Sequence, residues 1–167
     1  MELKKGLNVI IGWRATGKTL FIKNKLLRST PNSLVFDMHS EYKEINDAHK
    51  IKLFTNLPIK ERIETVIREL KKDRSSENVP RTFYFEDIYT VFNFKNIGEN
   101  EIRLRDVIKD KGMDLYFVFQ NYRTANRFID FIGGYDYAYI FKTIDRPLKD
   151  LTLDNKYESI AYIKGMP

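Results

Sequence analysis

The chain has 167 residues, 43% of them hydrophobic and 31% charged, which is typical of a single globular domain with a core of its own. The lack of cysteine excludes disulfides, thiolate metal sites and a cysteine nucleophile, and two histidines are too few for a histidine-rich metal site. A net charge of +6 favours a polyanionic partner, although lysines scattered over a solvated surface would give the same total.

Membrane and export signals are weak in this sequence. Its apolar runs do not approach the roughly 18 residues that a membrane span needs, so no membrane partner is expected. The apolar run at 7–11 is too short for a signal peptide. We therefore expect a cytoplasmic protein.

The first half of the chain alternates strand and helix patterns. The β-branched run at 7–11 predicts a buried strand, and a stretch with helical apolar spacing follows at 20–27. A second strand is expected at 33–37, where it ends in a carboxylate, and a third at 51–54. A helix is expected to begin at Pro58, a residue that is tolerated in the first turn, because the apolar residues after it have helical spacing.

The second half continues the alternation. Further strands are expected at 82–86, 115–119, 135–141 and 157–163, and further helices at 101–111 and 124–132, with a helical turn at 148–151. Strands that alternate with helices indicate a sheet that is covered on both faces. We therefore predict one α/β domain with a mainly parallel central sheet flanked by helices.

The clearest motif follows the first strand and has the form G-x-x-x-x-G-K-[ST], the pattern of a phosphate-binding loop or P-loop. It reads Gly12-Trp13-Arg14-Ala15-Thr16-Gly17-Lys18-Thr19. Its glycines let the backbone fold around phosphates, with N–H groups pointing inward at the start of the next helix. Lys18 is expected to reach the β- and γ-phosphates of a nucleotide, and the Thr19 hydroxyl to ligate Mg²⁺. The strand before the motif and the helix after it complete its required context and predict a P-loop NTPase.

A second acidic element closes the strand at 82–86, which ends in Glu86 and is followed by Asp87. In P-loop NTPases such a strand lies beside the phosphate loop; its first acid holds Mg²⁺ and a second acid polarises the attacking water. By position Glu86 is the metal partner and Asp87 the candidate base. Because the usual order is Asp then Glu, the division of roles between them stays open. A solvated strand end is the competing interpretation.

Two further strand ends complete a pattern. One strand ends in Asp37, with Glu41 and Tyr42 shortly after it, and another runs into Gln120 and Asn121. In this order the motifs resemble the FtsK–HerA superfamily of ring-forming DNA-pumping ATPases, and most of all the small viral genome-packaging ATPases of protein-primed phages and archaeal viruses. The likeness covers most of the chain and includes an arginine inside the P-loop. It implies a RecA-like (ASCE) fold, ATP and Mg²⁺ as cofactors, and self-association into a ring.

The resemblance also implies roles for individual residues. Lys18 and Thr19 would bind phosphate and Mg²⁺, and the two acids would serve metal and water. Arg14 would steady the γ-phosphate or couple to a neighbouring subunit. Gln120, or Asn121 beside it, would sense the γ-phosphate from the strand tip.

Motors of this superfamily also supply an arginine across the subunit interface, from near the helix before the sensing strand. That region offers Arg103, Arg105 and Lys109. Lys109 aligns best with the family's arginine, but a lysine lacks the planar fork of a guanidinium. Arg123, just past the sensing strand, is a further candidate, and a solvated face of a charged helix is the competing interpretation for Arg103 and Arg105.

Two departures from the family concern the P-loop and the chain's extent. Ala15 stands where many P-loops carry glycine. The nuclease-like second domain of tailed-phage motors has no counterpart here. We expect either a minimal motor or the N-terminal ATPase domain of a longer packaging protein.

A translocating ring grips the DNA backbone with Lys and Arg on loops that face its pore. Two segments are candidates: residues 92–96, which are aromatic and include Lys95, and Tyr42 with Lys43. Surface loops with buried aromatic side chains explain both segments as well. Bound DNA would be contacted through its backbone without sequence readout. His39 is given no role, and Trp13 either covers the nucleotide or packs on a neighbouring subunit.

The leading hypothesis is a Mg²⁺-dependent ATPase domain of a ring motor that packages double-stranded viral DNA into a capsid, with the capsid portal protein as a further partner and the host cytoplasm as its location. A small-molecule or nucleotide kinase would carry the same P-loop but needs an arginine-rich lid, and 123–127 reads instead as the start of a helix. A non-hydrolysing P-loop component of viral morphogenesis or secretion is a third hypothesis, supported by the reversed acids.

Overall fold

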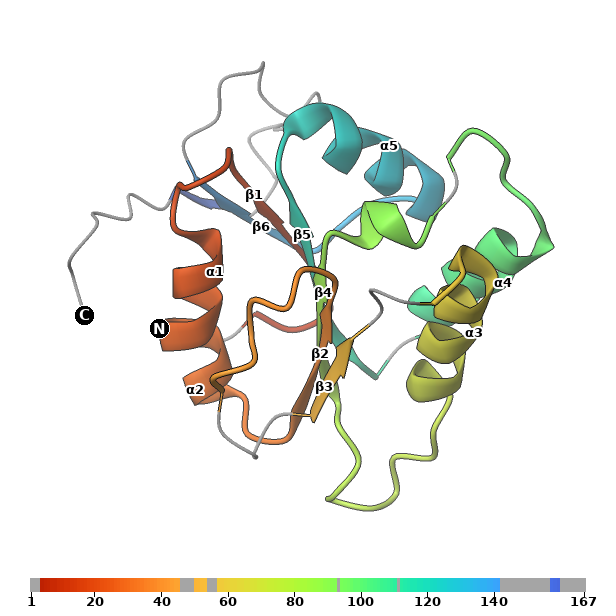
Figure 1. Ribbon diagram of the computed structural model, residues 1–167, viewed down its shortest axis with the longest axis horizontal. Helices are drawn as coiled ribbons and strands as arrows, with labels where there is room; N and C mark the ends of the chain where they lie inside the picture. The colour runs from red at the N-terminus through yellow and green to blue at the C-terminus, as the bar shows by residue number, and fades with distance from the viewer. Residues whose placement is uncertain are drawn as a thin grey trace.

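The computed structural model describes residues 4–45, 50–53, 57–92, 94–110, 112–141 and 157–159. Strands and helices alternate along the chain, as the hydrophobic pattern predicts (Figure 1). The strands are β1 (Leu7–Ile11), β2 (Ser33–Asp37), β3 (Lys50–Leu53), β4 (Thr82–Glu86), β5 (Asp114–Phe119), β6 (Tyr137–Ile140) and β7 (Tyr157–Ser159). The helices are α1 (Lys18–Phe21), η1 (Ile22–Leu26), α2 (Leu27–Ser29), α3 (Ile59–Leu70), η2 (Ile88–Thr90), α4 (Glu99–Ile108) and α5 (Tyr122–Ile132).

The helix expected at 20–27 is longer and less regular than its pattern predicts. Helical structure begins at Lys18 and continues to Ser29, with a π-helical turn, η1, between two α-helical pieces. A π-helical turn holds one extra residue, which apolar spacing alone does not reveal. The helical turn expected at 148–151 and the end of the strand expected at 157–163 lie outside the described residues.

Within the described residues the sheet has seven strands in the order β3-β2-β4-β5-β1-β6-β7, and every pair is parallel. The acidic strand β4 is not the immediate neighbour of β1, because β5 pairs with both β1 and β4 and lies between them. With strands about 4.8 Å apart, the ends of β1 and β4 are about 10 Å from each other. A side chain at the end of β4 must therefore extend past the end of β5 to face the loop that follows β1.

Helices cover both faces of the sheet, with α1, η1 and α2 on one side and α3, α4 and α5 on the other (Figure 1). Strand residues alternate between the two cores, because successive side chains point to opposite faces. The face under α3, α4 and α5 carries phenylalanines, and Phe85 stacks between Phe36 and Phe117 at ring-centroid distances of 4.6 Å. The opposite face carries tyrosines, with Tyr84 and Tyr116 stacked at 4.9 Å.

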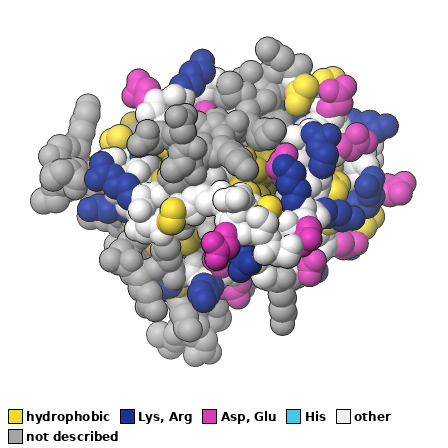
Figure 2. Space-filling view, turned by 90° about the horizontal axis from the view of Figure 1, so that it is seen from below, with side chains coloured by type: hydrophobic (Ala, Val, Ile, Leu, Met, Phe, Trp, Pro, Cys, Tyr) yellow, Lys and Arg dark blue, Asp and Glu magenta, His cyan; other side chains and the backbone are white. Residues whose placement is uncertain are grey.

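Two surface properties bear on the expected partners. Among the described residues, every helix falls short of the length and apolar character of a membrane span. On the face shown in Figure 2, the described Lys and Arg side chains are interspersed with Asp and Glu. On this side the net positive charge is thus spread out and not gathered into one patch.

The phenylalanine stack predicts where the fold is most sensitive. Phe117 is fully buried and packs on Phe128 of α5 at a centroid distance of 4.6 Å. Phe117→Ala is expected to lower the free energy of unfolding by about 3–5 kcal/mol because it leaves a cavity. The control Ile102→Ala, at a position 40% exposed, is expected to change it by less than about 0.5 kcal/mol. Denaturant titration measures both, and equal losses would contradict the packing described here.

Candidate nucleotide-binding site

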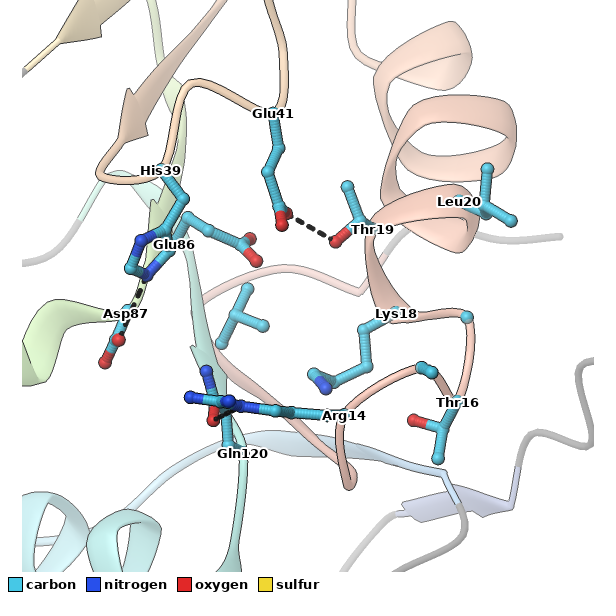
Figure 3. Close-up of a pocket in the computed structure, with 13 residues that line it drawn as sticks. Arg14, Thr16, Lys18, Thr19, Leu20, His39, Glu41, Glu86, Asp87 and Gln120 are labelled. Atoms are coloured by element: carbon cyan, nitrogen blue, oxygen red, sulfur yellow. Dashed lines mark hydrogen bonds and ion pairs between the residues drawn. The ribbon is translucent and has the colours of Figure 1, made fainter.

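A cavity of about 670 Å³ opens at the carboxyl edge of the sheet (Figure 3). The loops that follow β1, β2, β4 and β5 form its walls, and such an edge is the usual binding position in open α/β sheets. The lining residues come from these loops, from the start of α1 and from β5: Arg14, Ala15, Thr16, Gly17, Lys18, Thr19, Leu20, His39, Glu41, Glu86, Asp87, Val118 and Gln120.

The loop from Gly12 to Thr19 is shaped by its backbone. A Cβ atom at Gly12 would lie 2.5 Å from the Phe141 Cβ and 2.8 Å from the Thr16 hydroxyl oxygen, so only glycine fits. Gly17 has φ 93° and Ala15 has φ 59°, both in the left-handed region. Ala15 therefore takes a conformation for which many P-loops use glycine. The backbone strain of this conformation is offset by the packing of the rest of the fold.

Lys18 lies buried beneath this loop. Its Nζ donates hydrogen bonds to the Gly12 and Trp13 carbonyl oxygens at 2.6 and 2.9 Å. Burial lowers the pKa of the ammonium, while the charge of Glu86 across the cavity opposes that shift. The Trp13 side chain points outward and is 44% exposed.

The loop at 38–42, here called the β2 loop, forms the opposite wall. The buried Asp37 carboxylate accepts hydrogen bonds from the backbone N–H groups of His39, Glu41 and Tyr42 at 3.0–3.1 Å. Ser40 takes a left-handed conformation with φ 59°, which turns the chain inside the loop. One carboxylate thus fixes the backbone from which the His39, Glu41 and Tyr42 side chains project.

Glu86 at the end of β4 is the buried acid of the site. Its Oε2 accepts a hydrogen bond from the Tyr42 hydroxyl at 2.8 Å. Burial raises the pKa of the Glu86 carboxyl to about 7, although the Tyr42 bond and the charge of Lys18 lower it. The carboxylate points into the cavity (Figure 3).

Asp87 lies at the outer wall and faces away from the buried acid. Its backbone is left-handed, with φ 55°, and its Oδ2 lies 3.2 Å from the His39 Nε2. Aspartate tolerates this backbone conformation better than most residues do. The residue after β4 thus occupies a left-handed turn that aspartate adopts more readily than glutamate does.

Gln120 and Asn121 have different surroundings. Gln120 lines the cavity, and its Oε1 accepts a hydrogen bond from the Arg14 Nε at 3.1 Å. Asn121 instead caps α5, where its side-chain oxygen accepts from the Thr124 N–H at 2.9 Å. Of the two residues, Gln120 is the one positioned to meet a ligand.

The basic residues expected to act across a subunit interface do not line the cavity of their own chain. The Arg105 guanidinium lies 5.4 Å from the Phe131 ring centroid and pairs with Asp106. Lys109 follows α4 at the opposite edge of the sheet, where a Cβ at Gly133 would lie 3.3 Å from its Nζ. Exposed Arg103 lies on α4 as well. Arg123, in the first turn of α5, is on the same edge as the cavity.

The two segments suggested as pore loops are only partly exposed. Tyr42 is fully buried, and Phe92 packs at ring-centroid distances of 5.5 Å on both Phe94 and Phe128. Their aromatic side chains therefore belong to the cores, as the competing interpretation has it. Lys43 and Lys95 are exposed.

Three residues of the β2 loop make contacts in the site that were not predicted from sequence, where His39 was given no role and Tyr42 was suggested for a pore loop. His39 contacts Asp87, Glu41 accepts a hydrogen bond from the Thr19 hydroxyl at 2.9 Å, and Tyr42 contacts Glu86. Their position after a strand that ends in a buried carboxylate was the available signal. It indicates the correct edge of the sheet, but it does not specify which side chains meet.

The geometry of the loop between Gly12 and Thr19 predicts unequal effects of substitution at two small residues. Gly12→Ala is expected to lower the free energy of unfolding by about 1–3 kcal/mol, because its Cβ has no room. Ala15→Gly relieves a left-handed alanine and is expected to change stability by less than about 1 kcal/mol. Urea titration of both variants tests the loop, and a larger loss in the Ala15 variant would contradict it.

The buried Glu86 predicts an unusual dependence of stability on pH. Its folded-state pKa of about 7 lies above the ordinary value of 4.5, so the folded state binds the proton more tightly and loses stability as pH rises between these values. Glu86→Gln cannot ionise and keeps an acceptor for Tyr42. It is expected to be more stable than the wild type by about 2–3 kcal/mol at pH 8, with the gain vanishing toward pH 4. Denaturant titrations across this range measure it, with exposed Glu64→Gln as the matched control; parallel curves for Glu86→Gln and the wild type would contradict it.

Comparison with known proteins supports the fold. No protein-family model matches the chain, and no curated protein matches it. Among solved structures it is similar to the genome packaging NTPase B204 from Sulfolobus turreted icosahedral virus 2, solved in complex with ATP-gammaS. The TM-score is 0.51 and the identity 14%, over 70% of this chain and 64% of that chain. The chain thus spans slightly less than two thirds of this neighbour, and the likeness shows a shared α/β fold with a parallel sheet.

Proposed function

We propose that the chain is a P-loop ATPase and the motor domain of a viral genome-packaging machine of the FtsK–HerA type. The observation that carries this proposal is that Lys18 and Thr19 of the P-loop motif share one cavity with the buried acid Glu86. Similarity to a packaging NTPase that was solved with an ATP analogue gives independent support.

The nucleotide phosphates would lie in the cradle formed by the backbone between Gly12 and Thr19. Lys18 would exchange its two carbonyl partners for phosphate oxygens. Arg14, held by Gln120, would face the γ-phosphate. The exchange is favourable because an ammonium–phosphate contact is stronger than a contact with neutral carbonyls.

The site fits Mg²⁺. This ion takes oxygen ligands and is commonly held by one or two carboxylates together with substrate phosphates. Among the described residues, no group of three or more acids or histidines is placed to hold a metal ion by itself. Thr19 and Glu86 would hold it, with the Glu41 carboxylate beside the Thr19 hydroxyl. The bound ion would offset the charge of the β- and γ-phosphates.

Hydrolysis would use Glu86 and Asp87, at the end of β4, to position water for attack on the γ-phosphate. A basic residue from a neighbouring subunit would complete the site, with Arg105, Lys109 and Arg123 as candidates. An isolated subunit is therefore expected to turn over slowly. Ring assembly, movement of double-stranded DNA past Lys43 and Lys95, and delivery to a capsid portal complete the proposed function.

The first test is steady-state ATP hydrolysis as a function of protein concentration, with and without long double-stranded DNA. Turnover is expected to rise steeply with both, because a neighbouring subunit completes the site. Lys18→Ala is expected to reduce turnover to the buffer level, while Lys25→Ala, an exposed lysine on the same helical segment, is expected to behave as wild type.

Other outcomes would support the competing functions. Turnover that ignores concentration and DNA would indicate an ATPase that is not a ring motor. Phosphate transfer to a nucleoside monophosphate would establish a kinase. Tight ATP binding without turnover in the assembled state would indicate a non-hydrolysing component.

A further inference from the structure

The β2 loop contacts three residues that the sequence analysis placed in the ATPase site: Thr19, Glu86 and Asp87. Glu41 accepts a hydrogen bond from Thr19 at 2.9 Å, His39 lies 3.2 Å from Asp87, and Tyr42 donates to Glu86 at 2.8 Å. Figure 3 shows the His39, Glu41 and Glu86 side chains lying together in the upper part of the cavity. One loop thus touches the P-loop threonine and both acids.

Tyr42 is the most firmly held of these residues. Its side chain is fully buried in the core beneath α1 and η1. The backbone N–H of Tyr42 donates to the Asp37 Oδ2 at 3.0 Å, and the Lys23 ammonium lies 5.4 Å from the centre of its ring. The held backbone and the buried ring fix the position of the hydroxyl oxygen, which lies 2.8 Å from the Glu86 Oε2.

Glu86 depends on that hydroxyl for its orientation. The carboxylate extends from the end of β4 into the cavity, and the nearby Lys18 ammonium is already bonded to two P-loop carbonyls. The Tyr42 hydroxyl donates a hydrogen bond to the Glu86 carboxylate at 2.8 Å. Burial raises the pKa of the Tyr42 phenol well above its usual range, so the phenol keeps its proton and remains the donor.

We propose that Tyr42 is a positioning residue of the ATPase site, whose hydroxyl holds the Glu86 carboxylate in the orientation that hydrolysis requires. This inference rests on the proposed ATPase function and deepens it. It gives the Tyr42 hydroxyl a function in addition to the packing of its buried ring. Removal of the hydroxyl would free the carboxylate to rotate while leaving its charge and the P-loop intact.

A merely structural hydrogen bond is the competing role, and the chain offers a matched control for it. Tyr84, in the middle of β4, is also buried, and its hydroxyl shares a hydrogen bond of 2.8 Å with the Thr30 hydroxyl. Tyr84 does not line the cavity. Tyr42→Phe and Tyr84→Phe therefore each remove one hydroxyl and one buried hydrogen bond from the same core.

The test measures kcat, KM, the dissociation constant for ATP with Mg²⁺, and the free energy of unfolding for the full chain and both variants. The two variants are expected to lose similar stability. Tyr42→Phe is expected to lower kcat by about 10- to 100-fold, as loss of an orienting outer contact typically does, with ATP affinity within about 3-fold of wild type. Tyr84→Phe is expected to keep the wild-type kcat.

A double variant isolates the partner through which Tyr42 acts. In the Glu86→Ala background, which leaves Tyr42 no acceptor to orient, Tyr42→Phe is expected to change the remaining kcat by less than about 2-fold, because coupled residues are not additive. Equal kcat values for Tyr42→Phe and Tyr84→Phe, with an active wild type, would overturn the positioning role and leave the ATPase function standing. A wild type no faster than Lys18→Ala would overturn both.

Discussion

The parallel direction of four neighbouring strands is the constraint from which the rest of the site follows. Because β2, β4, β5 and β1 all end at the same edge, their four loops meet there without any long connection reaching across the molecule. The strand between β1 and β4 acts as a spacer of fixed width. It holds the ammonium of Lys18 and the carboxylate of Glu86 on opposite sides of a gap that a phosphate group could occupy.

The cavity also gathers strained backbone. Ala15, Ser40 and Asp87 are three of the four non-glycine residues with positive φ among the described residues, and each lies in a loop that walls the cavity. Such conformations cost of order 1–3 kcal/mol each and persist only where the surroundings enforce them. Here the enforcement comes from the two cores on either side of the sheet and from the Asp37 carboxylate. Rigid packing thus maintains loops that would relax if they were isolated.

Local features of the sequence predicted local features of the structure. The P-loop spacing and the apolar run ending in Glu86 indicated the main groups of the cavity, because motif and strand end are properties of short segments. Strand order was not accessible in the same way: nothing between 82 and 119 specifies that β5 inserts beside β1. The left-handed turn at Asp87 is a property of backbone dihedrals, and sequence alone showed it only as a reversed pair of acids.

The position of the Tyr42 side chain could not be settled from the sequence either. The sequence left two interpretations of Tyr42 open, a pore loop or a buried aromatic side chain, and the folded chain shows that its ring enters the core beneath α1 while Lys43 stays outside. Lys109 likewise aligned with a catalytic position but lies at the far edge of the sheet. In both cases the position of the side chain in the fold depends on residues that are far away in the chain.

Trp13 gives the molecule a spectroscopic property that follows from its position. It is the one tryptophan in the chain, it is 44% exposed, and its own carbonyl oxygen accepts a hydrogen bond from the Lys18 ammonium. Indole emission depends on solvent contact and on nearby charge. The tryptophan fluorescence of this protein therefore originates in the loop between Gly12 and Thr19, so the wild-type chain carries an optical reporter of that loop without any added label.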